Sequence, residues 1–137
     1  MIETTLRGSC LCGAVTYEAT GVATRFMHCH CRRCRKATGT GHASNLFLQP
    51  GTLRWLAGES QVRTYKVPEA QRFANFFCDT CGSRLPRQAG DAVVIAAGSL
   101  DDEPPLKPQA RIFQDSRAAW SCCGDGLPLY PAYPPPA

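Results

Sequence analysis

Hydrophobic residues along the chain fall in short runs that are separated by Gly, Pro and Asp. In residues 14–19, Val15, Tyr17 and Ala19 alternate with other residues, which is the period of two expected of a strand with one buried face. Similar runs recur along the sequence and predict a mainly β fold. The predicted strands span residues 14–19, 25–29, 44–48, 52–55, 61–67, 72–78 and 92–97.

A few segments depart from this alternation. Residues 92–97 are apolar on both faces and too short for a typical helix, so they predict a strand covered on both sides. One short helix is predicted from Arg32 to Thr38, because Gly39 follows it and is suited to cap a helix end. The Pro-rich tail at residues 131–137 is expected on the surface, partly extended.

The size and charge of the chain limit the classes of function. Its 137 residues match a single domain, with a core at about residues 7–130. The net charge of +4 is too mild for a dedicated nucleic-acid binder, so we consider nucleic acid an unlikely partner. The longest apolar stretch is far short of the roughly 20 residues that span a bilayer, and the N-terminus does not have the pattern of a signal peptide. We therefore expect a cytoplasmic protein with no membrane segment, and the sequence leaves its oligomeric state open.

Cysteine is the residue type that changes this picture. The chain has nine cysteines. Their odd number and close pairing, without a signal peptide, favour metal binding over a disulfide framework. Seven of them form three local groups: Cys10-Leu11-Cys12, then Cys29-His30-Cys31-Arg32-Arg33-Cys34, and Cys78-Asp79-Thr80-Cys81.

The spacings of the first and third groups predict a closed metal site. Residues two apart in an extended chain point to the same side, so Cys10 and Cys12 can present two sulfurs to one ion. Cys78 and Cys81, followed by Gly82, resemble a zinc knuckle, which supplies two more thiolates. These four cysteines therefore predict a structural Zn²⁺ site.

The middle group then forms a second centre with three ligands, Cys29, Cys31 and Cys34. Structural zinc usually has four protein ligands, whereas catalytic zinc has three and leaves one position for water or substrate. Zinc is favoured over an iron–sulfur cluster because the paired cysteines fit tetrahedral chelation of a single ion. We therefore expect two Zn²⁺ ions, the second with an open position.

The sequence also allows other interpretations of the middle group. Its thiols can be buried or free, or a fourth ligand from His28, His42 or Cys122 can make the site purely structural. His30 is a poor ligand for the same ion, because in an extended chain it points away from its neighbours. Cys122 and Cys123 are either incidental thiols or a reversible plug of the open position.

Residues that follow the middle group are candidates for catalysis and substrate binding. His42 can act as an acid or base, although a single histidine is more often a surface or packing residue. Zn²⁺ with three thiolates carries a net charge of −1, so nearby cations would stabilise it and could also contact a substrate. The same cations can instead form a solvated helix face. They are Arg32, Arg33, Arg35 and Lys36.

With these motifs the chain resembles the glutathione-dependent formaldehyde-activating enzyme (GFA) family, which includes centromere protein V. The resemblance rests on Gly8-Ser9-Cys10-x-Cys12-Gly13-Ala14-Val15, His28-Cys29-x-Cys31-x-x-Cys34-Arg35-Lys36, Phe77-Cys78-x-x-Cys81-Gly82-Ser83 and Gly98-Ser99-Leu100-Asp101. It implies an Mss4-like zinc-binding β-sheet fold, with structural zinc on the first and third groups and a second zinc on the middle group. The family activity joins formaldehyde to the thiol of glutathione, giving S-hydroxymethylglutathione, and is classed as a carbon–sulfur lyase.

Two functions of different class follow from these observations. The first is a zinc-dependent, carbon–sulfur lyase-like enzyme that acts on a small thiol, such as glutathione, and its aldehyde adduct at the open three-cysteine site. The second is a non-catalytic binding module, stabilised by two structural zinc ions, that engages a protein partner. The accessibility of the second zinc separates them, because closed sites resist thiol ligation.

Overall fold

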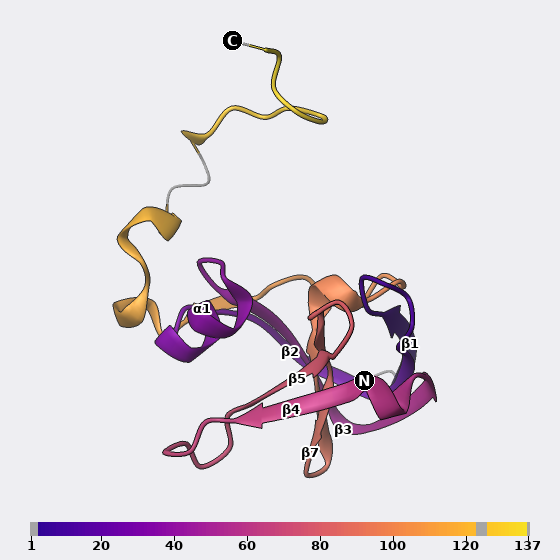
Figure 1. The fold of residues 1–137 in the computed structure, drawn as a ribbon. Helices are drawn as coiled ribbons and strands as arrows, with labels where there is room; N and C mark the ends of the chain where they lie inside the picture. Colours follow the sequence, from indigo (N-terminus) through magenta and orange to yellow (C-terminus); the bar gives the residue numbers. More distant parts are fainter. Residues whose placement is uncertain (1–2, 123–125, 137) are drawn as a thin grey trace.

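The computed structural model describes residues 3–122 and 126–136, and β-strands dominate it (Figure 1). The strands are β1 (Glu3–Ser9), β2 (Thr16–Cys29), β3 (Ala43–Ala57), β4 (Val62–Lys66), β5 (Ala74–Cys78), β6 (Arg84–Leu85), β7 (Arg87–Ala89), β8 (Ala92–Ala96) and β9 (Ala110–Ile112). The helical elements are α1 (Arg32–Thr38) and the short 3-10 helices η1 (Glu59–Gln61), η2 (Ala97–Ser99), η3 (Gln114–Ser116) and η4 (Ala119–Cys122). The predicted mainly β class with one short α-helix is confirmed for this part of the chain.

These strands form two sheets. The main sheet has the order β1-β2-β3-β8-β7, and β9 adds to β2 as a parallel strand. The smaller sheet has the order β4-β5-β6. The strands β2 and β3 pair along almost their whole length, from Thr16 opposite Ala57 to Cys29 opposite Ala43. Cys29 is the last residue of β2 and lies just before α1 in the sequence; Figure 1 shows α1 at this end of the strand.

The hydrophobic core contains buried residues from both sheets. Val15, Tyr17 and Ala19 are fully buried, which confirms the alternation predicted for this segment. Val93 and Ile95 of β8 are also fully buried and belong to the same cluster. Each fully buried aliphatic side chain contributes roughly 1.5–3 kcal/mol relative to an exposed one, so this layer is the main source of stability outside the metal sites.

The short helix agrees with its prediction. It spans Arg32–Thr38 and ends at Gly39, whose φ of 71° is in the left-handed region. The backbone N–H of Gly39 donates to the carbonyl oxygen of Arg35 at 2.8 Å, which satisfies one carbonyl of the last turn. No helix in the described residues is long and apolar enough to cross a membrane.

The predicted strands were too short in the first half of the sequence. Residues 25–29 continue β2 and are not a separate strand, and residues 44–48 and 52–55 both belong to β3. The gaps between these predicted strands contain Gly21 and Gly51, which lie opposite each other in the β2–β3 ladder. Their lack of side chains lets the two strands approach closely at this point, so the pairing continues through it. The prediction also missed four strands: β1, β6, β7 and β9.

Gly21 allows us to test this close approach. A Cβ atom built on Gly21 would overlap the backbone oxygen of Pro50 and lie 2.7 Å from the Cα of Gly51. Both obstacles are backbone atoms and cannot rotate away, so Gly21→Ala is expected to lower the free energy of unfolding by about 2–3 kcal/mol. Urea denaturation of the metal-loaded protein measures the change. Gly98→Ala is the control, because nothing lies within 4 Å of its added Cβ; equal effects of the two substitutions would contradict the prediction.

Candidate metal centres

The first metal centre is formed by Cys10, Cys12, Cys78 and Cys81. Their four Sγ atoms all lie within 4.8 Å of one another. The Sγ atoms of Cys10 and Cys12 are 3.6 Å apart, and those of Cys12 and Cys78 are 3.9 Å apart. Four sulfurs bound at about 2.3 Å around a tetrahedral zinc ion are about 3.8 Å apart, whereas disulfide sulfurs are only about 2 Å apart. The geometry therefore fits a metal chelate.

Two tight turns, one from each sheet region, bring these sulfurs together. The first follows β1, where the N–H of Gly13 donates to the carbonyl oxygen of Cys10 at 3.1 Å. The second follows β5, where the N–H of Gly82 donates to the carbonyl oxygen of Cys78 at 2.8 Å. Both glycines have positive φ, 81° and 75°. Cys10 and Cys12 thus pair as predicted, but a turn brings them together and not an extended chain.

The local electrostatics show that this group is suited to a cation. The backbone N–H of Ser83 stabilises a thiolate and lowers the pKa of Cys81 to about 5. The backbone N–H of Ala14 favours the Cys12 thiolate, but the other thiols outweigh it, Cys10 first, and the pKa of Cys12 is raised to about 11. Four sulfurs in this space cannot all ionise unless a cation offsets their mutual repulsion.

The second group, Cys29, Cys31 and Cys34, lies where β2 leads into α1. Cys29 ends β2, Cys31 is the N-terminal cap of α1, and Cys34 lies in the first turn. Their Sγ atoms are within 4.8 Å of one another, and the backbone N–H of Cys34 donates to the Cys31 sulfur at 3.3 Å. Burial raises the pKa values of Cys34 and Cys29. Burial thus favours the protonated form of two of the three thiols. A bound cation is needed before all three can ionise.

The structure places the histidines that were candidate fourth ligands in a separate cluster. The rings of His28 and His42 stack with centroids 3.9 Å apart, and His30 lies 5.1 Å from His42. Among the described residues, no histidine or carboxylate joins the three cysteines in one group of potential ligands. The Cys122 side chain and Cys123 lie outside the described residues, so the plug hypothesis stays a prediction.

The three-cysteine group borders a cavity of about 480 Å³. Its walls come from both sheets, α1 and the segment after β9. They include four arginines and several apolar side chains, but none of the described residues that line it is Asp or Glu. The lining residues other than the cysteines are Met27, Arg32, Arg33, Asn45, Phe47, Phe73, Ala74, Arg84, Arg87, Val94, Ile112, Phe113 and Ser116.

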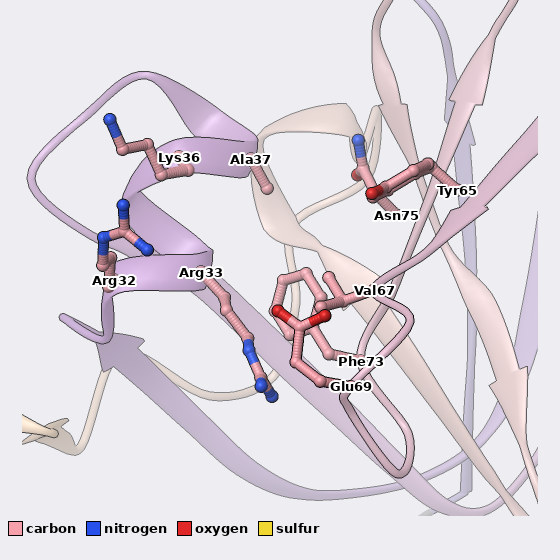
Figure 2. A pocket seen from close by; sticks show the side chains of 9 residues that line it. All are labelled: Arg32, Arg33, Lys36, Ala37, Tyr65, Val67, Glu69, Phe73 and Asn75. Carbon is pink, nitrogen blue, oxygen red and sulfur yellow. The ribbon is translucent and has the colours of Figure 1, made fainter.

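A second cavity of about 430 Å³ shares part of this wall (Figure 2). The basic side chains of Arg32, Arg33 and Lys36 lie on one side of it, along α1, and Tyr65 and Glu69 lie on the other. Arg32 and Arg33 border both cavities. Of the other predicted substrate contacts on α1, Lys36 borders only this second cavity.

The other predicted candidates lie elsewhere. Arg35 is half-buried and lines neither cavity. His42 is not among the described residues that line the cavity of the three cysteines, so its role as acid or base stays a prediction. The sequence reasoning missed Arg84 and Arg87, which line this cavity from β6 and β7. Their strands have only two and three residues, so no periodicity marks them.

A mainly β framework that carries one four-cysteine and one three-cysteine group defines a protein with two potential metal centres. The sequence model of the glutathione-dependent formaldehyde-activating enzyme family matches residues 5–116, and the chain belongs to this family. All seven clustered cysteines lie within that match.

One similar solved structure is a crystal structure of a protein from Rhodobacter sphaeroides. It has a TM-score of 0.51 and 22% sequence identity, and the match covers 77% of this chain and 99% of that chain. At this identity the similarity concerns the fold, which is compatible with an Mss4-like arrangement. No curated protein matches the chain.

Proposed function

We propose that the protein is a zinc-dependent, carbon–sulfur lyase-like enzyme that acts on a small thiol, glutathione or a similar compound, and its aldehyde adduct. The observation that carries this proposal is the three-cysteine group: its sulfurs are close enough to share one ion, and it borders a cavity large enough for a small molecule. Three thiolate ligands are the arrangement that leaves one position for a substrate.

The reaction needs little from the protein beyond binding and charge. The thiol loses its proton, its sulfur forms a bond to the aldehyde carbon, and the carbonyl oxygen takes up a proton; the reverse steps cleave the adduct. Bound zinc would supply a Lewis acid that favours the thiolate form of a ligated substrate. Phe73 and Ile112 provide apolar wall beside Cys29, Cys31 and Cys34, where they would limit access of water.

The thiol content of the two centres also bears on the cellular location of the protein. Two centres built entirely of thiols persist where cysteines are kept reduced, which favours the cytoplasm. We also propose that residues 1–137 act as one domain.

The alternative is a non-catalytic binding module for a protein partner. The cavity in Figure 2 favours it, because three exposed basic side chains, those of Arg32, Arg33 and Lys36, lie opposite Tyr65, which is 58% exposed. Exposed aromatic and arginine side chains together are typical of protein interfaces. In that case both metals are structural and the second site does not accept a thiol.

Cobalt substitution distinguishes these two functions. We expect the protein loaded with two Co²⁺ ions to change its visible absorption when glutathione is added, because the sulfur of glutathione becomes a new ligand. The Cys29, Cys31 and Cys34 triple Ser variant, which keeps only the four-cysteine site, should not respond. A wild-type spectrum that stays unchanged at millimolar glutathione, with both sites filled, would contradict the enzyme proposal and favour the binding module.

A further inference from the structure

The cavity beside the three cysteines contains an unbalanced positive charge. Its described lining residues include four arginines and no carboxylate. Arg32 and Arg33 are exposed on α1, where water and salt screen their charges. Arg84 and Arg87 line the cavity from β6 and β7 and are half-buried, on either side of Leu85 and the fully buried Pro86. These two are therefore the arginines whose charge acts most strongly inside the cavity.

Arg84 lines this cavity, and one of its nitrogens has no hydrogen-bond acceptor. Arg84 also borders a different cavity beside Cys10, but its guanidinium carbon lies 5.7 Å from the centre of the Phe73 ring, and Phe73 lines the cavity of the three cysteines. The Nη1 atom is buried without a hydrogen-bond acceptor. A buried charged donor without an acceptor is costly, and an anionic ligand would remove that cost.

Arg87 lies in the same environment. Burial lowers its pKa, and the charge of Arg84 lowers it further, so the two guanidinium groups repel each other. The ion pairs found in residues 3–122 and 126–136 join Arg7 and Arg54 to Glu18 and Arg63 to Asp79, and none involves Arg84 or Arg87. Two neighbouring half-buried cations without an acidic partner form a site prepared for an anion.

We propose that Arg84 and Arg87 bind a carboxylate of the substrate while its sulfur lies at the three cysteines, which makes these two arginines the residues that select for that carboxylate. The position of the sulfur rests on the proposed function, whereas the carboxylate site rests on the two arginines. A carboxylate fits because its two oxygens can accept paired hydrogen bonds from the guanidinium fork. The cavity of about 480 Å³ is large enough to hold both ends of such a molecule.

The test compares three probes by isothermal titration with the zinc-loaded protein. Glutathione has both the thiol and free carboxylates, glutathione dimethyl ester keeps only the thiol, and S-methylglutathione keeps only the carboxylates. We expect the ester to bind at least about tenfold more weakly than glutathione, the size of effect produced by losing a charged hydrogen-bond partner. Glutathione and ester of equal affinity would overturn the inference and leave the proposed function intact.

Substitutions then assign the effect to the two arginines. Arg84→Gln and Arg87→Gln should each weaken glutathione at least about tenfold and leave the affinity of the ester unchanged. Arg63→Gln is the matched control, because Arg63 is exposed on β4 and pairs with Asp79. An equal loss in this control would overturn the inference, since it would indicate only a general effect of net charge. Zinc content and circular dichroism confirm that each variant is folded. If only one of the two arginine variants folds, that variant suffices for the comparison.

S-Methylglutathione separates the failure of this inference from failure of the proposed function. If it binds the wild type, and Arg84→Gln or Arg87→Gln weakens it at least about tenfold, the carboxylate site stands even if no thiol reaches the metal. If it binds equally well to wild type and both variants, the arginines are not the carboxylate site.

Discussion

Cys78→Ser is expected to unfold the protein. Cys78 is fully buried at the end of β5, and its sulfur belongs to the four-cysteine group that connects the turn after β1 in the main sheet with the turn after β5 in the smaller sheet. A structural zinc site of this kind contributes about 10–16 kcal/mol in small zinc-binding peptides, whereas whole domains are stable by about 5–15 kcal/mol. If loss of the Cys78 ligand releases the zinc, the protein loses a contribution as large as its whole stability.

The measurement combines zinc content per chain with circular dichroism and thermal unfolding. The variant should lose the zinc of the first centre and show no cooperative transition. Thr80→Ala is the matched control within the same turn: Thr80 is exposed and its hydroxyl bonds only to surface partners, so its loss should cost less than about 1 kcal/mol. A Cys78→Ser protein with full zinc content and a wild-type melting temperature would show that this centre is not structural.

Hydrogen bonds around the four-cysteine centre also support its structural role. The N–H of Val15 donates to the Cys10 sulfur at 3.3 Å, and the N–H of Cys78 donates to the Ser83 carbonyl oxygen at 3.0 Å. Val15 is fully buried in the main core. The sulfur cluster and the core are thus continuous, which explains why a metal ligand here should affect the whole fold and not only its own turn.

Signals that are local in sequence allowed much of the candidate site to be predicted. Two tight turns determine most of the four-cysteine group, and the helix that holds Cys34 has its own C-terminal cap at Gly39. Each turn and the helix form whichever strands pair, although joining the two turns into one group depends on the fold. The same is true of the alternation at Val15 and Tyr17, which marks a buried face wherever the strand lies.

The features that could not be predicted depend on long-range strand pairing. His42 reaches His28 only because Cys29 lies opposite Ala43 in the β2–β3 ladder, which brings together two segments that a helix and a turn separate in sequence. Arg84 becomes a half-buried cation only because β6 pairs with β5, and a guanidinium cannot be recognised as unpaired until its surroundings are known. Charge in a sequence is visible, but burial is a property of the fold.

Replacing Cys29, Cys31 and Cys34 together by Ser is expected to have the opposite outcome to Cys78→Ser: one zinc is lost, activity disappears and the fold remains. These cysteines form a small cluster with Ala43, separate from the main core, so their contribution to stability is local. Serine is a poor zinc ligand because its hydroxyl is not ionised at neutral pH, so the open site cannot form.

Three measurements check this expectation. Metal analysis should find two zinc ions per chain in the wild type and one in the triple variant, and circular dichroism should remain wild-type in shape. Nuclear magnetic resonance should show that the wild type accelerates exchange between glutathione, formaldehyde and their adduct, while the variant leaves it at the uncatalysed rate. If the variant unfolded as completely as Cys78→Ser, the second centre would be structural too; if it kept both zinc ions, the three cysteines would not be the ligands. Only loss of one zinc with retention of fold matches a division between one centre that holds the sheets together and one that receives substrate.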